Sequence, residues 1–213
     1  MSNSLIIETD LRGLLPDVRD QGPRPLCLAF AASDFNSVHN QLTFDLSVEY
    51  LAHHAYIKDG HGNFQLGLTT KSIVEALYGE GQPSEAQFPY DCSATSPRLP
   101  LSDFKPKHYV KATESTTCID SINEHLNDRN VIVACIALPK TFQTLTAPYI
   151  LDNEVGEIGN HAVLIVGKAK GQCGSSFFLI RNSWGATWGD GGHCWLSESF
   201  LKTRTFALIK VAK

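Results

Sequence analysis

The chain has 213 residues, of which 43% are hydrophobic and 19% are charged, and its formal net charge is −4. A chain of this length and composition can bury a core large enough to fold without disulfides or bound metal. The charge balance, without clustered Lys and Arg, argues against nucleic acid as a partner, and no apolar run has the length of a bilayer span, which argues against a membrane.

The N-terminus and the cysteines favour a reducing compartment. Met1–Ile7 lacks a basic start followed by a long apolar core, so we expect no secretory signal. The six cysteines are irregularly spaced and form no Cys-x-x-Cys pair, so we expect no zinc site, no redox site and no cofactor. These features predict a cytoplasmic protein.

The segment from Asp20 to Ala32 is the stretch around which the chain is organised. Pro25 suits the first turn of a helix, and from Leu26 to about Asn40 apolar residues surround the helix axis, which predicts a helix buried on most sides. Cys27 then lies at the N-terminus of this helix, where the partial positive charge favours a thiolate. The alternative is that Cys27 is simply a small buried apolar residue.

Two further helices and a long loop are expected next. Ser47 is the predicted N-cap of the second helix. Thr69–Tyr78 is the predicted third helix, closed by the glycines that follow it. Ser93–Pro106, rich in Pro, Ser and Thr, is the expected crossing between two lobes.

The second half of the chain has the pattern of strands. Apart from one short helix near residues 118–126, it contains five predicted strands: His108–Ala112, Val131–Leu138, Ala162–Val166, Ser176–Ile180 and Thr205–Val211. Helices followed by strands predict an α+β fold: one domain, 1–213, with a helical lobe at about 19–104, a β-rich lobe at about 105–213 and an N-terminal segment that crosses over. A site is expected in the cleft between the lobes.

Three sequence blocks resemble the papain-like cysteine peptidases, and together they extend over nearly the whole chain: Gln21–Phe30, Asn160–Gly167 and Asn182–Gly192. His161 and Asn182 follow Cys27 by 134 and 155 residues, near the spacing of about 130–150 residues in that family. The resemblance implies the papain-like two-lobe fold, with a helical left lobe and a β-barrel-like right lobe.

The resemblance also implies the roles of four residues. Cys27 would be the nucleophile, His161 the base that holds its proton, and Asn182 the amide that orients His161. The side chain of Gln21 and the backbone N–H of Cys27 would stabilise the oxyanion. The implied activity is hydrolysis of peptide bonds through an acyl-enzyme intermediate, with a protein or peptide as the substrate.

Four residues are assigned to substrate binding by the same resemblance. Gly67 and Leu68 would line the main side-chain pocket and favour an apolar side chain, although Leu68 could equally serve to pack the entry of the third helix. Trp184 would cover the hydrogen bond between Asn182 and His161, or would serve in core packing alone. Asn160 is the fourth residue that the resemblance assigns to substrate binding.

The chain departs from the family pattern near the nucleophile. Arg24 stands where secreted members have a disulfide-bonded cysteine, and Leu28 replaces the usual aromatic residue. We expect Arg24 to form an exposed ion pair with Asp20 or Asp34, worth little energetically; the alternative is that it attracts an acidic group of the substrate. The short segment before Leu15 leads us to expect no inhibitory pro-segment, as in a bacterial-type member.

Two alternative functions remain open on the sequence. An amidase, a deamidase or an acyl transferase could use the same three residues on another acceptor. A non-catalytic homologue could keep the fold and bind a peptide. A regulatory protein or inhibitor is not identified by the sequence.

Overall fold

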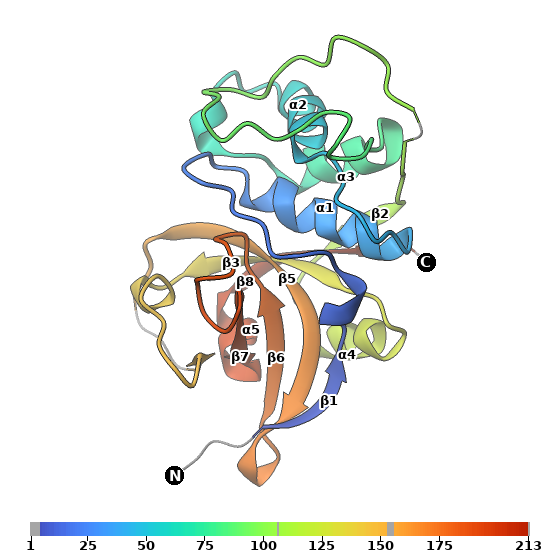
Figure 1. The fold of residues 1–213 in the computed structure, drawn as a ribbon. Helices are drawn as coiled ribbons and strands as arrows, with labels where there is room; N and C mark the ends of the chain where they lie inside the picture. Colours follow the sequence, from blue (N-terminus) through green and yellow to red (C-terminus); the bar gives the residue numbers. More distant parts are fainter. Residues whose placement is uncertain (1–4, 106, 153–155, 213) are drawn as a thin grey trace.

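The computed structural model describes residues 5–105, 107–152 and 156–212. Its elements in chain order are β1 (Ile6–Asp10), η1 (Arg12–Leu14), α1 (Cys27–His39), α2 (Val48–Asp59), η2 (Phe64–Leu66), α3 (Thr70–Gly79), β2 (Ala112–Ser115), α4 (Ile119–Asn127), β3 (Ile132–Leu138), η3 (Lys140–Phe142), β4 (Ile150–Leu151), β5 (Gly159–Lys170), η4 (Gln172–Gly174), β6 (Ser176–Arg181), β7 (His193–Ser197), α5 (Glu198–Arg204) and β8 (Thr205–Val211). Figure 1 shows α1–α3 on one side of the molecule and the sheet on the other.

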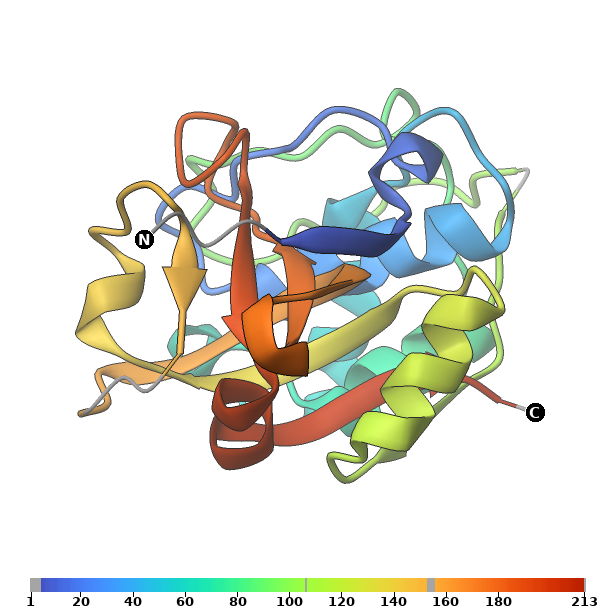
Figure 2. The same ribbon diagram turned by 90° about the horizontal axis from the view of Figure 1, so that it is seen from below.

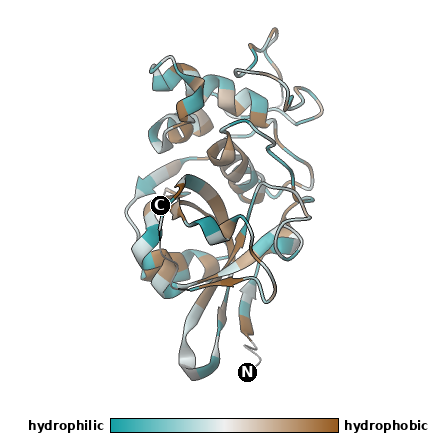
Figure 3. Ribbon diagram, turned by 90° about the vertical axis from the view of Figure 1, so that its left-hand side faces the viewer, coloured by the Kyte–Doolittle hydropathy of each residue, from teal (hydrophilic) through white to brown (hydrophobic). Residues whose placement is uncertain are grey.

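Helix α1 lies between the outer helices and the sheet (Figure 1). Every residue from Leu28 to Val38 is buried, as expected for a helix whose apolar residues surround the axis. Figure 3 shows hydrophobic residues along this central helix and along the strands. The helix predicted from Leu26 to about Asn40 is therefore confirmed, and it places its N-terminus at the junction of the two parts.

The outer helices begin and end at residues suited to these positions. The side chain of Ser47 accepts the N–H of Tyr50 at 3.1 Å, and the side chain of Thr69 accepts the N–H of Ser72 at 3.2 Å. Such N-caps satisfy donors that the first turn of a helix leaves unpaired. Gly60 ends α2 with a φ of 67°, a left-handed conformation that glycine adopts without steric cost. The predicted N-cap at Ser47 is confirmed.

The sheet has eight strands in the order β2-β8-β3-β5-β6-β7-β4, and β1 pairs with β5 outside this path. Of these pairings, only that of β4 with β7 is parallel among the described strands. Nearly every residue of β3 is buried, because α1 packs against β3 and β5. Figure 2 shows α4 and α5 at the periphery of the sheet.

A buried network of ion pairs joins α1 to the sheet. Asp34 of α1 accepts a hydrogen bond from Nε of Arg181 at 2.8 Å and another from Nη2 of Arg19 at 2.9 Å. Arg181, the last residue of β6, also donates to the carbonyls of Pro16 and Asp17 at 2.8 and 2.7 Å. These contacts hold the end of β6 in a defined position relative to α1.

One predicted strand is wrong. The strand expected at His108–Ala112 is absent from the described sheet, in which β2 begins only at Ala112, and His108 forms an isolated bridge outside the named strands. The N–H of Val110 donates to the carbonyl of Leu77 in α3. The backbone of residues 108–110 is therefore bound to α3 and to the segment that follows it, whereas the carbonyl of Lys111 accepts the N–H of Ala212, directly after β8.

Among the remaining elements, the longer ones agree with the sequence-based prediction and the short ones were not predicted. The strands predicted at 131–138, 176–180 and 205–211 are confirmed as β3, β6 and β8, and the strand at 162–166 is the centre of the longer β5. β1, β4, β7 and α5 were not predicted; they are seven residues or shorter and carry little periodic pattern. The lobe boundaries near residues 19 and 105 stay a prediction. Among the described helices, none is long and apolar enough to cross a bilayer.

Candidate active site

Cys27 is the first residue of α1, and the residue as a whole is partly exposed. The preceding residue, Leu26, provides no side-chain cap. The first N–H groups of the helix are therefore not satisfied by a capping side chain, and their partial positive charge is directed toward the thiol. The expectation that Cys27 lies at the N-terminus of a buried helix is confirmed.

The sheet brings His161 and Asn182 together. His161 lies at the start of β5, and the pairing of Leu164 with Arg181 places the residue after Arg181 beside it. Asn182 Oδ1 lies 2.7 Å from His161 Nε2, and the N–H of Ser183 donates to the same oxygen at 2.8 Å. Because this oxygen is an acceptor, Nε2 carries the proton and Nδ1 is left for a second partner.

That second partner is Cys27. Burial by itself would raise the pKa of the Cys27 thiol, but the hydrogen bond and the charge of His161, with the N–H groups of Ala162 and Leu28, lower it below its ordinary value. Burial acts to lower the pKa of His161, and the thiolate of Cys27 and the hydrogen bond to Asn182 raise it. The two shifts in opposite directions favour a thiolate–imidazolium pair.

Aromatic rings enclose the imidazole. The ring of Trp184 lies 4.8 Å from that of His161 and the ring of Phe142 lies 5.9 Å from it, measured between centroids. Trp188 packs on Phe142 at 4.7 Å and donates its indole N–H to the carbonyl of Phe142 at 3.0 Å. Trp184 thus contacts the site directly and belongs to an aromatic cluster at the same time.

Gln21 is held by hydrogen bonds at both ends of its side-chain amide. Its Oε1 accepts from the hydroxyl of Ser183 at 2.7 Å, and its Nε2 donates to the carbonyl of Arg24 at 2.8 Å. An amide nitrogen has two hydrogens, so one remains for a ligand. Gln21 is thereby linked through Ser183 to the residue that orients His161.

A pocket of about 610 Å³ opens beside Cys27 and His161. Gly67, Leu68 and Asn160 line it, as expected for substrate-binding residues, whereas Trp184 is not among its described lining residues. Leu66, in the region expected to form the pocket, also lines it. The remaining lining residues were not identified from the sequence: Pro25, Leu28, Gln65, Thr69, Thr70, Cys135, Ala162 and Phe206. Cys135 enters the wall because it pairs with Ala162, a register that the sequence does not show.

The expectation for Arg24 is wrong. Its side chain is buried and forms two hydrogen bonds with the carboxylate of Glu49, at 2.6 and 3.0 Å. Asp20 accepts the N–H of Gly22 instead, and Asp34 pairs with the two arginines of the network described above. Arg24 is therefore not an exposed residue of the cleft, and the structure gives no support for its alternative role in attracting an acidic substrate.

The other cysteines have different surroundings. Cys92 and Cys118 are exposed and free, and Cys194 is buried and free. Burial, with a contribution from the charge of Cys27, raises the pKa of Cys135 to about 12. Within residues 5–105, 107–152 and 156–212, no group of His, Cys, Asp and Glu side chains is arranged to hold a metal ion.

Comparison with known proteins identifies the family. A family model described as papain family cysteine protease matches residues 8–205. The chain belongs to the papain family.

Among curated papain-family relatives, fruit bromelain of Ananas comosus is 24% identical over 199 residues, which cover 85% of this chain and 51% of that protein. Peptidase 1 of Dermatophagoides farinae is 30% identical over 197 residues, covering 87% and 59%. The chain thus spans about half the length of the curated relatives that it matches.

The papain-like fold is also seen in a solved structure. Bromelain from Ananas comosus in complex with the E64 inhibitor superimposes with a TM-score of 0.75 at 21% identity, covering 96% of this chain and 98% of that one. This likeness shows the α+β papain-like fold.

Replacement of His161 by alanine should raise the pH at which Cys27 becomes reactive toward iodoacetamide. With the imidazolium absent, burial is the largest influence on the thiol, and its pKa rises. In the wild type, alkylation should decline only as the pH falls through the lowered pKa. The rate of Cys27 alkylation, followed by peptide mass spectrometry across pH, measures the shift.

The exposed His39, in the last turn of α1, provides the control, since alanine there should leave the alkylation curve unchanged. Equal midpoints for wild type and His161→Ala would contradict the thiolate–imidazolium pair.

Proposed function

We propose that this chain is a cysteine peptidase in which Cys27, His161 and Asn182 act together. The main support for this proposal is the chain of hydrogen bonds from Asn182 to His161 to Cys27, together with the lowered pKa of the thiol and the raised pKa of the imidazole. In this arrangement the thiolate attacks a peptide carbonyl, and His161 donates its proton to the leaving amine. Water, activated by His161, then releases the acyl group.

The oxyanion of the tetrahedral intermediate needs donors that are already in place. The free N–H of the Gln21 amide and the N–H of Cys27 at the helix N-terminus are the proposed pair. Each such donor is typically worth about 3–4 kcal/mol of transition-state stabilisation. The hydrogen bonds that hold both ends of the Gln21 amide support this role.

The proposed substrate is a protein or peptide with an apolar side chain seated in the pocket. Among its described lining residues are Leu66, Leu68 and Phe206, and it contains no Asp, Glu, Lys or Arg. Burying an apolar side chain against such a wall is favourable, whereas a charged side chain would be desolvated there with no Asp, Glu, Lys or Arg in the described lining to pair with. The cleavage-site preference should follow from this contrast.

No observation in the structure favours an amidase, a deamidase, a transferase or a non-catalytic peptide-binding role over hydrolysis of peptide bonds. The cytoplasmic location expected from the sequence remains a proposal, which fractionation of the native cell would test. An inhibitor or regulatory partner is not identified.

Digestion of a peptide library, followed by mass spectrometry, tests the proposed function. We expect internal or terminal cleavage with an apolar residue enriched at one position near the scissile bond. Because E64 is the inhibitor in the solved bromelain complex, we expect it to block cleavage by this chain. A library left intact by the wild type, or cleavage that E64 does not affect, would contradict the proposal.

A further inference from the structure

The ion pair between Arg24 and Glu49 lies in the interior beside the start of α1. Glu49 of α2 is fully buried and Arg24 nearly so. Besides its two bonds to Glu49, the Arg24 guanidinium donates to the carbonyls of Asp91 and Ser96 at 2.9 and 3.1 Å. Glu49 also accepts the N–H of Arg98 at 2.8 Å. One side chain thus connects the active-site loop to α2 and to the loop at 91–98.

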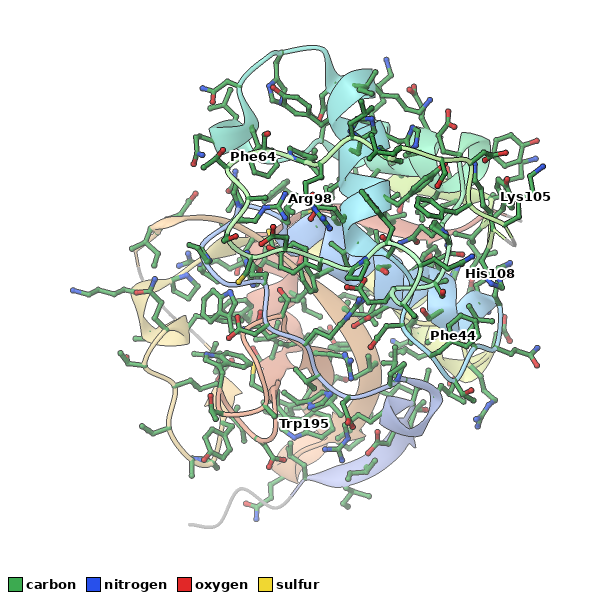
Figure 4. The ribbon with its side chains drawn as sticks, turned by 45° about the horizontal axis from the view of Figure 1, so that its top comes forward. Phe44, Phe64, Arg98, Lys105, His108 and Trp195 are labelled. Atoms are coloured by element: carbon green, nitrogen blue, oxygen red, sulfur yellow. The ribbon has the colours of Figure 1, made fainter. Side chains whose placement is uncertain are left out.

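Two aromatic rings pack against the same guanidinium. Its Cζ lies 4.9 Å from the ring centroid of Tyr90 and 5.5 Å from that of Phe64, in η2. Figure 4 labels Phe64 and Arg98, which come from two different segments; Phe64 packs on Arg24 and the N–H of Arg98 donates to Glu49. The segment that contains Phe64 continues into Gly67 and Leu68, which line the pocket.

Arg24 and Tyr90 both hold Gln21. The carbonyl of Arg24 accepts the Nε2–H of Gln21 at 2.8 Å, and the hydroxyl of Tyr90 donates to the backbone carbonyl of Gln21 at 2.7 Å. The side chain of Arg24 is therefore anchored in the interior while its backbone directs the Gln21 amide. Tyr90 fixes the backbone of Gln21 from the other side.

The energetics of the ion pair favour a positional role. Taking two charges out of water costs several kcal/mol per ion, so a buried ion pair is weak evidence for a gain in stability. The planar guanidinium, however, presents its donors in a rigid fork, so its bonds to Glu49 fix the position of the Arg24 backbone. An oxyanion donor must lie within about 2.7–3.1 Å of the developing charge, so a small displacement of Gln21 would remove its contribution.

We propose that Arg24, anchored by Glu49, and Tyr90 are positioning residues that hold the Gln21 amide toward the oxyanion. The assignment rests on the proposed peptidase function, since it concerns how a donor of that site is held. Neither residue touches the reacting atoms; both act through Gln21.

The test compares Arg24→Lys, Tyr90→Phe and Gln21→Ala, together with each of the first two in the Gln21→Ala background. Lysine keeps the charge and loses the fork. We expect kcat on a cleaved peptide to fall at least about tenfold for Arg24→Lys and about fivefold for Tyr90→Phe, while KM changes less than about twofold. In the Gln21→Ala background, neither substitution should lower kcat further.

Two measurements distinguish positioning from a general loss of structure. Alkylation of Cys27 by iodoacetamide needs no oxyanion donor, so its rate should stay at the wild-type value in both variants. Arg12→Lys is the matched control, because that side chain is partly exposed and pairs with Asp10, away from Glu49; it should retain wild-type kcat.

The assignment would be overturned if a folded Arg24→Lys kept full kcat. It would also be overturned if the loss of kcat in the double variants were the product of the two single losses, or if the rate of Cys27 alkylation fell together with kcat. If Arg24→Lys does not fold, the Tyr90→Phe pair of variants decides by the same criteria. If the wild type cleaves no peptide, the proposed function and this assignment both fail. If the wild type cleaves peptides but the variants do not behave as expected, only this assignment fails.

Discussion

Replacement of Cys27 by alanine should abolish peptide cleavage, with a loss in kcat on the order of 10⁶-fold, the size seen when the nucleophile of a related triad is removed. The substitution removes the atom that attacks the carbonyl, so no acyl intermediate can form. It leaves the donors of Gln21 and the helix N-terminus in place, so a small residual rate above the uncatalysed reaction is expected. Cys27 is a partly exposed residue, and alanine is a good helix former, so the fold should persist.

Steady-state kinetics on a peptide from the library digest, with circular dichroism of the same sample, measures this effect. Cys118→Ala is the control, since Cys118 is an exposed thiol at the start of α4, and its activity should equal that of the wild type. Cleavage by Cys27→Ala at more than one hundredth of the wild-type rate would show that another group carries out the reaction.

Replacement of Asp34 by asparagine should lower the free energy of unfolding by about 3–5 kcal/mol, the usual cost of breaking a buried ion pair by changing one partner. Asp34 is buried and accepts hydrogen bonds from both Arg19 and Arg181. Asparagine has nearly the same shape but leaves two cations beside a neutral amide. In a chain of this size the melting temperature should fall by about 6–20 °C.

The same substitution should affect catalysis, because Arg181 precedes Asn182 directly and its position depends on Asp34. We expect kcat to fall together with stability, as measured by urea unfolding and by peptide cleavage at a temperature where the variant is folded. Asp103→Asn is the control: Asp103 pairs with Lys105 and Lys107 on the surface, and its loss should leave unfolding unchanged. Equal unfolding curves for wild type and Asp34→Asn would show that the network does not contribute to stability.

Elements with a long, regular pattern could be predicted from the sequence. Helix α1 is apolar around its axis, β3 is a continuous apolar run and β8 is mostly apolar, so each contains enough residues to define its own type. The short strand β7 and the helix α5 were not predicted, because their conformation depends on the elements against which they pack. The error at residues 108–110 has the same origin, since the backbone partners of His108 and Val110 lie in the helical part.

The candidate site divides in the same way. Cys27, His161, Asn182 and Gln21 were found because their local sequences are distinctive and match a known family. Cys135 and Phe206 were not found, because neither has a local signal and both reach the pocket only through the pairing of β3 with β5 and the position of β8. Trp184, expected over the hydrogen bond between Asn182 and His161, lies against the imidazole and is not among the described lining residues of the pocket.

The amino-acid sequence by itself determined which reactive groups this protein has and which of them stand at the ends of regular elements. Helix and strand propensities act over a few residues, so they could indicate a thiol at a helix N-terminus and an imidazole before a strand. Only the tertiary structure decided the partners of the buried charges, Arg24 with Glu49 and Asp34 with Arg181, which are 25 and 147 residues apart. Which charges pair depends on which surfaces are buried against each other, and this burial is determined by the packing of the whole chain.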